Sequence, residues 1–131
     1  MNRYKQREQA FALIFQSLFS ETEPQEIIDA LLEDEETVIG DYSKQLFFGV
    51  CEKKNELDEI ISEFSTGWKL NRISKVNLSI LRLAVYEMKY IDDVPDSVAI
   101  NEAVELAKRY STKEDSSFVN GILGSFSRSR A

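Results

Sequence analysis

Three basic residues near the start of the chain could bind the phosphates of a nucleic acid. Arg3, Lys5 and Arg7 stand among the first seven residues, which hold no acid. In a helix, Arg3 and Arg7 lie one turn apart on one side, close to the apolar stripe of Ile14 and Leu18. An unpaired buried guanidinium would be costly, so we expect the first turns to overhang the bundle or fray and offer these cations to phosphates. The alternative is an ordinary N-terminal turn whose charges are solvated. Three basic residues are a weak signal, so by themselves they favour this alternative.

The polar segment 111–118 is the second candidate for nucleic-acid contact. It is rich in hydroxyl and carboxylate groups and ends in Phe118. An exposed aromatic ring beside such groups could stack on an unpaired base. The alternative, which the residues by themselves favour, makes Asp115 or Ser116 the N-cap of the last helix and Phe118 its first core residue.

The chain lacks the residues that most catalytic and metal sites need. It has no histidine and a single cysteine, Cys51. This excludes Ser-His-Asp and Cys-His activation, a histidine- or cysteine-rich zinc site and an intramolecular disulfide. A lone thiol also fits a reducing compartment. The sequence therefore predicts a binding protein without enzymatic activity, metal or cofactor.

Other conspicuous residues have structural interpretations. Trp68 is predicted to be a core anchor, Cys51 a small buried hydrophobic residue, and Gly121 a point of close helix packing. Four polar residues are predicted to form a buried network that pins two helices together. That network comprises Arg82, Glu87, Asn101 and Glu102.

Helices must position these residues. Apolar residues recur with helical spacing almost throughout, and no stretch alternates for long enough to indicate a strand. With 131 residues, 43% of them hydrophobic, the chain suits one domain spanning residues 1–131. We expect an all-α bundle of about seven helices. The predicted helices are 3–19, 24–35, 41–65, 68–73, 74–91, 97–110 and 115–127, and the last residues are predicted to fray.

The charge distribution restricts the partners. The net charge is −7, and residues 21–41 hold nine acids and no base, so a nucleic acid would meet a narrow, oriented surface. The apolar runs are too short for a membrane span, and the first residues lack the pattern of a signal peptide. We therefore expect the protein in the cytoplasm.

Several motifs resemble those of the NusB family of bacterial transcription antitermination factors. The most specific are the block beginning Asn101-Glu102-Ala103 and the block Phe118-Val119-Asn120-Gly121, which follow each other at the family's spacing. Matching segments elsewhere extend the resemblance over essentially the whole chain. These are Arg7–Ala10, Leu13–Gln16, Trp68–Ile73, Leu81–Met88, Val94–Pro95 and Val98–Lys108.

The resemblance implies two small helical bundles that share the first helix, in either a monomer or a homodimer. It also implies binding of the single-stranded boxA element of ribosomal RNA leaders together with NusE, a small ribosomal protein. With other Nus factors, this complex would suppress termination by RNA polymerase. The implied NusE contacts are Phe15 and Asn77, where the family often has an acid. The implied RNA contacts are Arg3, Lys5, Gln6, Arg7, Asp115, Ser116 and Phe118.

A different class of function stays open beside this one. A helical adaptor could bind other proteins through its acidic second helix and an apolar groove, without touching RNA. Competition between boxA RNA and an unrelated strand of equal length would separate the two interpretations.

Overall fold

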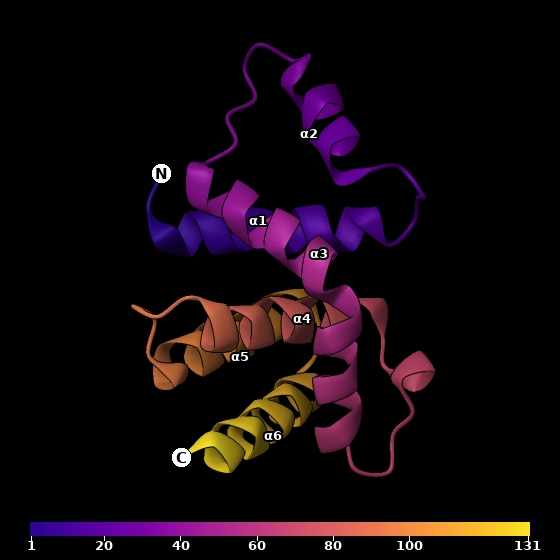
Figure 1. The fold of residues 1–131 in the computed structure, drawn as a ribbon, viewed down its shortest axis with the longest axis vertical. Coiled ribbons are helices and arrows are strands. Elements are labelled where there is room, and N and C mark those ends of the chain that lie inside the picture. The colour runs from indigo at the N-terminus through magenta and orange to yellow at the C-terminus, as the bar shows by residue number, and fades with distance from the viewer.

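The computed structural model describes residues 1–131 and consists of helices joined by short connections (Figure 1). The all-α class is confirmed, with six α-helices and one short 3₁₀ helix in place of about seven helices. None of them is both long and apolar enough to cross a membrane. The elements are α1 (Arg3–Ser17), α2 (Pro24–Leu32), α3 (Asp41–Phe64), η1 (Leu70–Arg72), α4 (Lys75–Tyr90), α5 (Asp96–Tyr110) and α6 (Lys113–Arg130).

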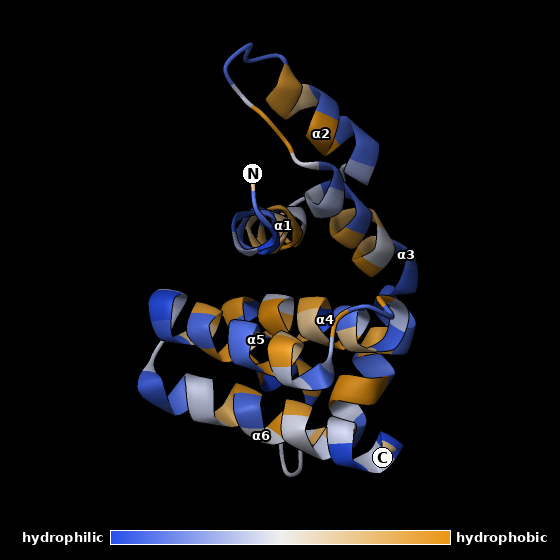
Figure 2. Ribbon diagram, turned by 90° about the vertical axis from the view of Figure 1, so that its left-hand side faces the viewer, coloured by the Kyte–Doolittle hydropathy of each residue, from blue (hydrophilic) through white to orange (hydrophobic).

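The helices form two groups that α1 and α3 connect. In Figure 1, α2, α1 and the first half of α3 lie above α4, α5, α6 and the second half of α3. α1 packs against both α3 and α4, so the first helix joins the groups as expected; α3 also packs against α2, α4 and α6. In Figure 2, α1 is seen end-on, with its hydrophobic side turned toward α3. Thirty buried hydrophobic residues join into one core.

The long helix α3 runs unbroken through Gly49, although glycine is a poor helix former. A Cβ atom at Gly49 would lie 2.1 Å from Cζ of Tyr86. The ring of Tyr86 on α4 therefore occupies the space that any other side chain would need. Gly49 marks a close approach of two helices rather than the end of one.

Local hydrogen bonds set the starts of α4 and α6. Ser74 accepts a hydrogen bond from the backbone of Asn77 at 3.1 Å, and Thr112 accepts one from the backbone of Asp115 at 3.0 Å. The prediction that Asp115 or Ser116 caps the last helix is wrong, because Thr112 provides the cap and the helix begins earlier. The expected fraying is also wrong, since α6 extends to Arg130.

Candidate nucleic-acid interface

Arg7 is an internal residue of the fold and not part of a free cationic end. Its side chain is 8% exposed, and its Nε donates to both carboxylate oxygens of Glu87, at 2.9 and 2.8 Å. The hydroxyl of Tyr42 donates to the same carboxylate, and burial together with this bond raises the pKa of Tyr42. The prediction that Arg7 overhangs the bundle is wrong, because Glu87 on α4 supplies the partner that offsets the free-energy cost of burial.

Arg3 and Gln6, two of the other residues predicted to contact RNA, also make contacts within the fold, whereas Lys5 does not pair with an acid. Arg3 pairs with Asp93 at 3.2 Å and lies 4.2 Å from the ring centre of Tyr42. Gln6 accepts a hydrogen bond from the backbone of Tyr42 at 2.9 Å, so it caps the start of α3, where Gly40 offers no side chain. Lys5 is exposed and, unlike Arg3 and Arg7, forms no ion pair.

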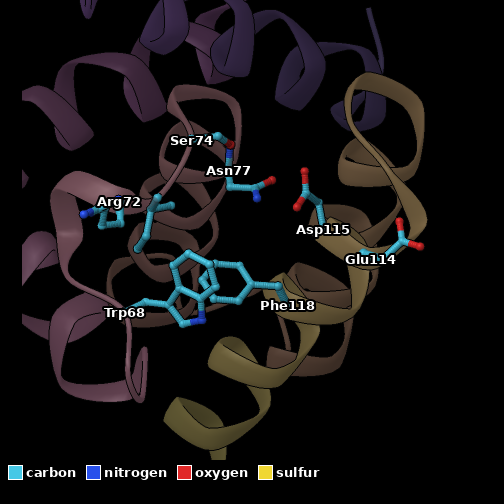
Figure 3. A pocket seen from close by; sticks show the side chains of 8 residues that line it. Trp68, Arg72, Ser74, Asn77, Glu114, Asp115 and Phe118 are labelled. Carbon is cyan, nitrogen blue, oxygen red and sulfur yellow. The ribbon is translucent and has the colours of Figure 1, made fainter.

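The second predicted region lines a cleft of about 360 Å³ between the start of α4 and the start of α6 (Figure 3). Phe118 is half-buried and packs against the core while also lining the cleft. Its ring meets that of Trp68 edge-on, with the ring centres 5.9 Å apart. Phe118 therefore packs against the core, as one interpretation expects, and it also lines the cleft, where stacking on a base stays a prediction. The lining residues are Trp68, Arg72, Ile73, Ser74, Asn77, Glu114, Asp115 and Phe118.

The cleft brings together residues that the resemblance gave to two different partners. Asn77 and Asp115 point toward one another in Figure 3. Asn77 is buried, and its Oδ1 is the one buried side-chain oxygen or nitrogen without a hydrogen-bond partner. Asp115 accepts a hydrogen bond from the hydroxyl of Ser111. Such an unpaired buried oxygen is unfavourable unless a ligand supplies a donor.

Ser116 is not brought into this cleft. Its side chain is buried, and its hydroxyl donates to the carbonyl of Lys113 at 2.7 Å. It faces a shallow groove on the α5 side of the helix, together with Asn101 and Asn120. The hydroxyl of Ser116 therefore serves the first turn of α6.

Phe15 belongs to a row of aromatic side chains that runs along α1 and continues just past its end at Ser17. Its ring centre lies 6.2 Å from that of Phe11 and 5.0 Å from that of Phe19. Phe15 is half-buried, whereas Phe19 is 62% exposed. The amino group of Lys75 lies 5.9 Å from the ring centre of Phe19, so the row reaches the start of α4, where Asn77 is found.

The predicted polar network divides into separate ion pairs. Glu87 pairs with Arg7, whereas Arg82 makes two hydrogen bonds to Asp58 on α3, at 2.8 and 2.9 Å. Asn101 is exposed and neither it nor Glu102 pairs with Arg82 or Glu87. The prediction of one network is wrong, because α1 and α3 provide the partners instead of α5.

Two further structural predictions are also wrong. Trp68 is 54% exposed and belongs to the cleft instead of anchoring the core. Gly121 is exposed, and a Cβ atom there would meet nothing within 4 Å, so no neighbouring helix requires it.

Cys51 is half-buried, and burial raises the pKa of its thiol. Of the residues that line the cleft, Trp68 is the one that the sequence gave the least reason to expect. Gly67 is typical of an ordinary turn, and a tryptophan after it is typical of a core residue.

The model of the NusB family matches residues 4–128 of this chain. The chain belongs to the NusB family. The transcription antitermination protein NusB of Ruminiclostridium cellulolyticum is 47% identical over 130 residues, covering 98% of this chain and 90% of the relative. NusB of Acetivibrio thermocellus is 50% identical over 126 residues, covering 95% and 87%.

Solved structures of NusB proteins share the fold. T. maritima NusB superposes with a TM-score of 0.85 at 34% identity, covering 98% of this chain and 92% of that one. The antitermination factor NusB in a crystal structure with NusE and double-stranded RNA gives a TM-score of 0.83 at 25% identity, covering 98% and 99%. The likeness to NusB therefore extends over nearly the whole of each chain.

Proposed function

We propose that this chain is a transcription antitermination factor that binds single-stranded, boxA-containing RNA together with NusE. With other Nus factors it would then suppress termination by RNA polymerase in the cytoplasm. We also propose that it acts by binding alone, as one domain and without enzymatic activity. The observation that carries this proposal is the family match over residues 4–128, supported by the full-length likeness to a NusB that was solved with NusE and RNA.

The accessible candidates for RNA contact are Lys5, Asp115, Phe118 and Arg3. Lys5 is an exposed cation free of ion pairs, and Phe118 presents an aromatic face to the cleft. The exposed pair of Arg3 with Asp93 is weak enough to exchange its carboxylate for a phosphate. Gln6, Arg7 and Ser116 would act indirectly, by holding α1, α3 and α6 in position.

NusE fits the aromatic row on α1 and the neighbouring start of α4. Exposed aromatic rings such as Phe19, beside half-buried Phe15, are typical of protein interfaces. Asn77 lies near the end of this row, and its unpaired Oδ1 would accept a hydrogen bond from an NH group of the partner. NusE would then border the cleft with Phe118, so that RNA could contact both proteins.

Titration of fluorescently labelled RNA with the protein, alone and with NusE, tests the proposal. Three probes are needed: a boxA strand, an unrelated strand of equal length and a boxA duplex. We expect the boxA strand to bind best and NusE to tighten its binding about fivefold to 100-fold, in the range of ordinary coupling between sites. Removing one cation that neutralises a phosphate should reduce the salt slope by about 0.7, so Lys5→Ser should lower it by about that amount.

A pair of matched variants on α6 tests the site. Phe118→Leu should weaken binding of the boxA strand, whereas Phe126→Leu, a core change at a ring that is 5% exposed, should lower stability and leave RNA affinity unchanged. If NusE binds but neither protein nor pair prefers boxA to the unrelated strand, the chain is a protein adaptor. A preference for the duplex would overturn the single-stranded substrate.

A further inference from the structure

The exposed indole of Trp68 stands at the edge of the cleft. It is the only tryptophan in the chain and remains 54% exposed at the end of a turn in which Gly67 has a φ of 81°. Phe118 contacts the indole edge-on, and Figure 3 labels both residues on the lining of the cleft. An aromatic surface left open beside a cleft can stack on a base, because every base offers a flat π face.

Three cations without ion pairs follow Trp68 at regular spacing. Lys69, Arg72 and Lys75 are all exposed, and none takes part in the seven ion pairs of the structure. From Ser65 to Tyr86 the chain holds no acid at all, although its net charge is −7. A local positive surface therefore adjoins the exposed indole.

The opposite wall of the cleft has the opposite charge. Glu114 and Asp115 on α6 line the cleft across from Arg72 (Figure 3). Carboxylates repel phosphates, whereas lysine and arginine neutralise them and release counterions. A nucleic-acid strand in the cleft would therefore keep its backbone on the side of Arg72 and turn its bases toward α6.

We infer that the segment Trp68–Lys75, here called the cationic turn, is a further RNA-contact surface. Trp68 stacks on one unpaired base, and Lys69, Arg72 and Lys75 neutralise the adjoining phosphates. This inference rests on the proposed function. It adds which wall of the cleft the RNA backbone faces, and it adds contact residues that the sequence did not predict. The cationic turn takes the role that the sequence gave to Arg7, whose charge is neutralised inside the fold.

Intrinsic fluorescence gives a direct readout, because all of this chain's tryptophan signal comes from Trp68 and a titration of NusE alone supplies the background. Adding unlabelled boxA strand to the protein with NusE should change this fluorescence saturably, with the same midpoint as binding of labelled RNA. Trp68→Ala should weaken RNA binding about fivefold to 100-fold, the effect of removing one stacking platform for a base. Trp68→Phe, which keeps a ring, should restore most of the affinity. Helical circular dichroism verifies that both variants fold.

Two triple variants with equal charge change test the cations. Changing Lys69, Arg72 and Lys75 to serine should lower the salt slope of RNA binding by about 2, at about 0.7 for each neutralised phosphate. Changing Lys44, Lys53 and Lys54 to serine is the control, since these lysines also lack ion pairs but lie on α3, outside the cationic turn. The control should leave the slope within about 0.7 of the wild-type value.

The outcomes separate this inference from the proposed function. If labelled RNA binds while Trp68 fluorescence stays constant and Trp68→Ala binds normally, the inference is wrong and the proposed function stands. If Trp68 responds to NusE and shows no further response to RNA, the cationic turn belongs to the protein interface and the inference is again wrong. If RNA fails to bind at all in the presence of NusE, both fall together.

Discussion

Replacing Arg7 by methionine should destabilise the fold instead of removing an RNA contact. The methionine side chain keeps most of the aliphatic volume but cannot donate to Glu87, which is 1% exposed. Glu87 would then keep only the hydrogen bond from Tyr42. A buried carboxylate without its counter-charge is strongly unfavourable, because it has lost its water and gained too few protein donors.

The expected loss is about 3–5 kcal/mol, the range for breaking a buried ion pair by removing one partner. Against a total of about 5–15 kcal/mol for an ordinary domain, this is a large part of the stability. Adding Glu87→Gln to Arg7→Met removes the buried charge and retains an acceptor for Tyr42, so the double variant should recover about 2 kcal/mol. Arg3→Met is the exposed control and should lose less than about 1 kcal/mol.

Urea unfolding monitored by helical circular dichroism measures these free energies. RNA binding is then measured at temperatures where each variant is folded. The reasoning is refuted if Arg7→Met unfolds within about 1 kcal/mol of the wild type and its RNA salt slope falls by about 0.7. That pair of results would restore Arg7 as a phosphate contact.

Three further predictions concern packing and pH. Gly49→Ala should lose about 1–3 kcal/mol of stability, because its Cβ would press on the ring of Tyr86; urea unfolding checks this, and a neutral result would contradict the close approach. Gly121→Ala, with open space around the new Cβ, should instead gain up to about 1 kcal/mol, and a loss would show hidden packing. Burial acts to raise the pKa of Glu8, but hydrogen bonds from Tyr110 and Arg109 outweigh it and lower the pKa below 4.5. The stabilisation from Glu8 is therefore complete above about pH 4.5 and is lost as the pH falls through its lowered folded value, so the stability gap between wild type and Glu8→Gln should narrow from pH 6 to 3.5.

The sequence predicts the helices well because each depends on local spacing. The apolar spacing along α3 and the turn before α5 can be recognised in the sequence. The bounds of these helices in the structure differ from the predicted bounds by only a few residues. The start of α6 differs because Thr112 competes with Asp115 and Ser116 as a capping group, and all three residue types are suitable caps.

Long-range partners explain most of the errors at the site. Arg7 and Glu87 are 80 positions apart, and no local pattern shows that they meet. The expectation of a free cationic end correctly identifies that a buried Arg7 needs a partner, but it misses that α4 supplies one. Trp68 shows the reverse case, because its apolar bulk suggests burial while the turn at Gly67 leaves the indole at the surface.

An acidic chain can bind RNA when some of its cations pair with its own acids and others stay unpaired together at one surface. Seven of the 16 lysines and arginines form ion pairs, and the remainder include the three cations of the cationic turn. At physiological salt, exposed charges farther apart than about 8 Å are largely screened. The acids of residues 21–41 therefore do little to a phosphate held beside Arg72, whereas Glu114 and Asp115 across the cleft act on it directly. On the inference drawn above, local charge, and not the net value of −7, would decide where RNA lies and which way its backbone faces.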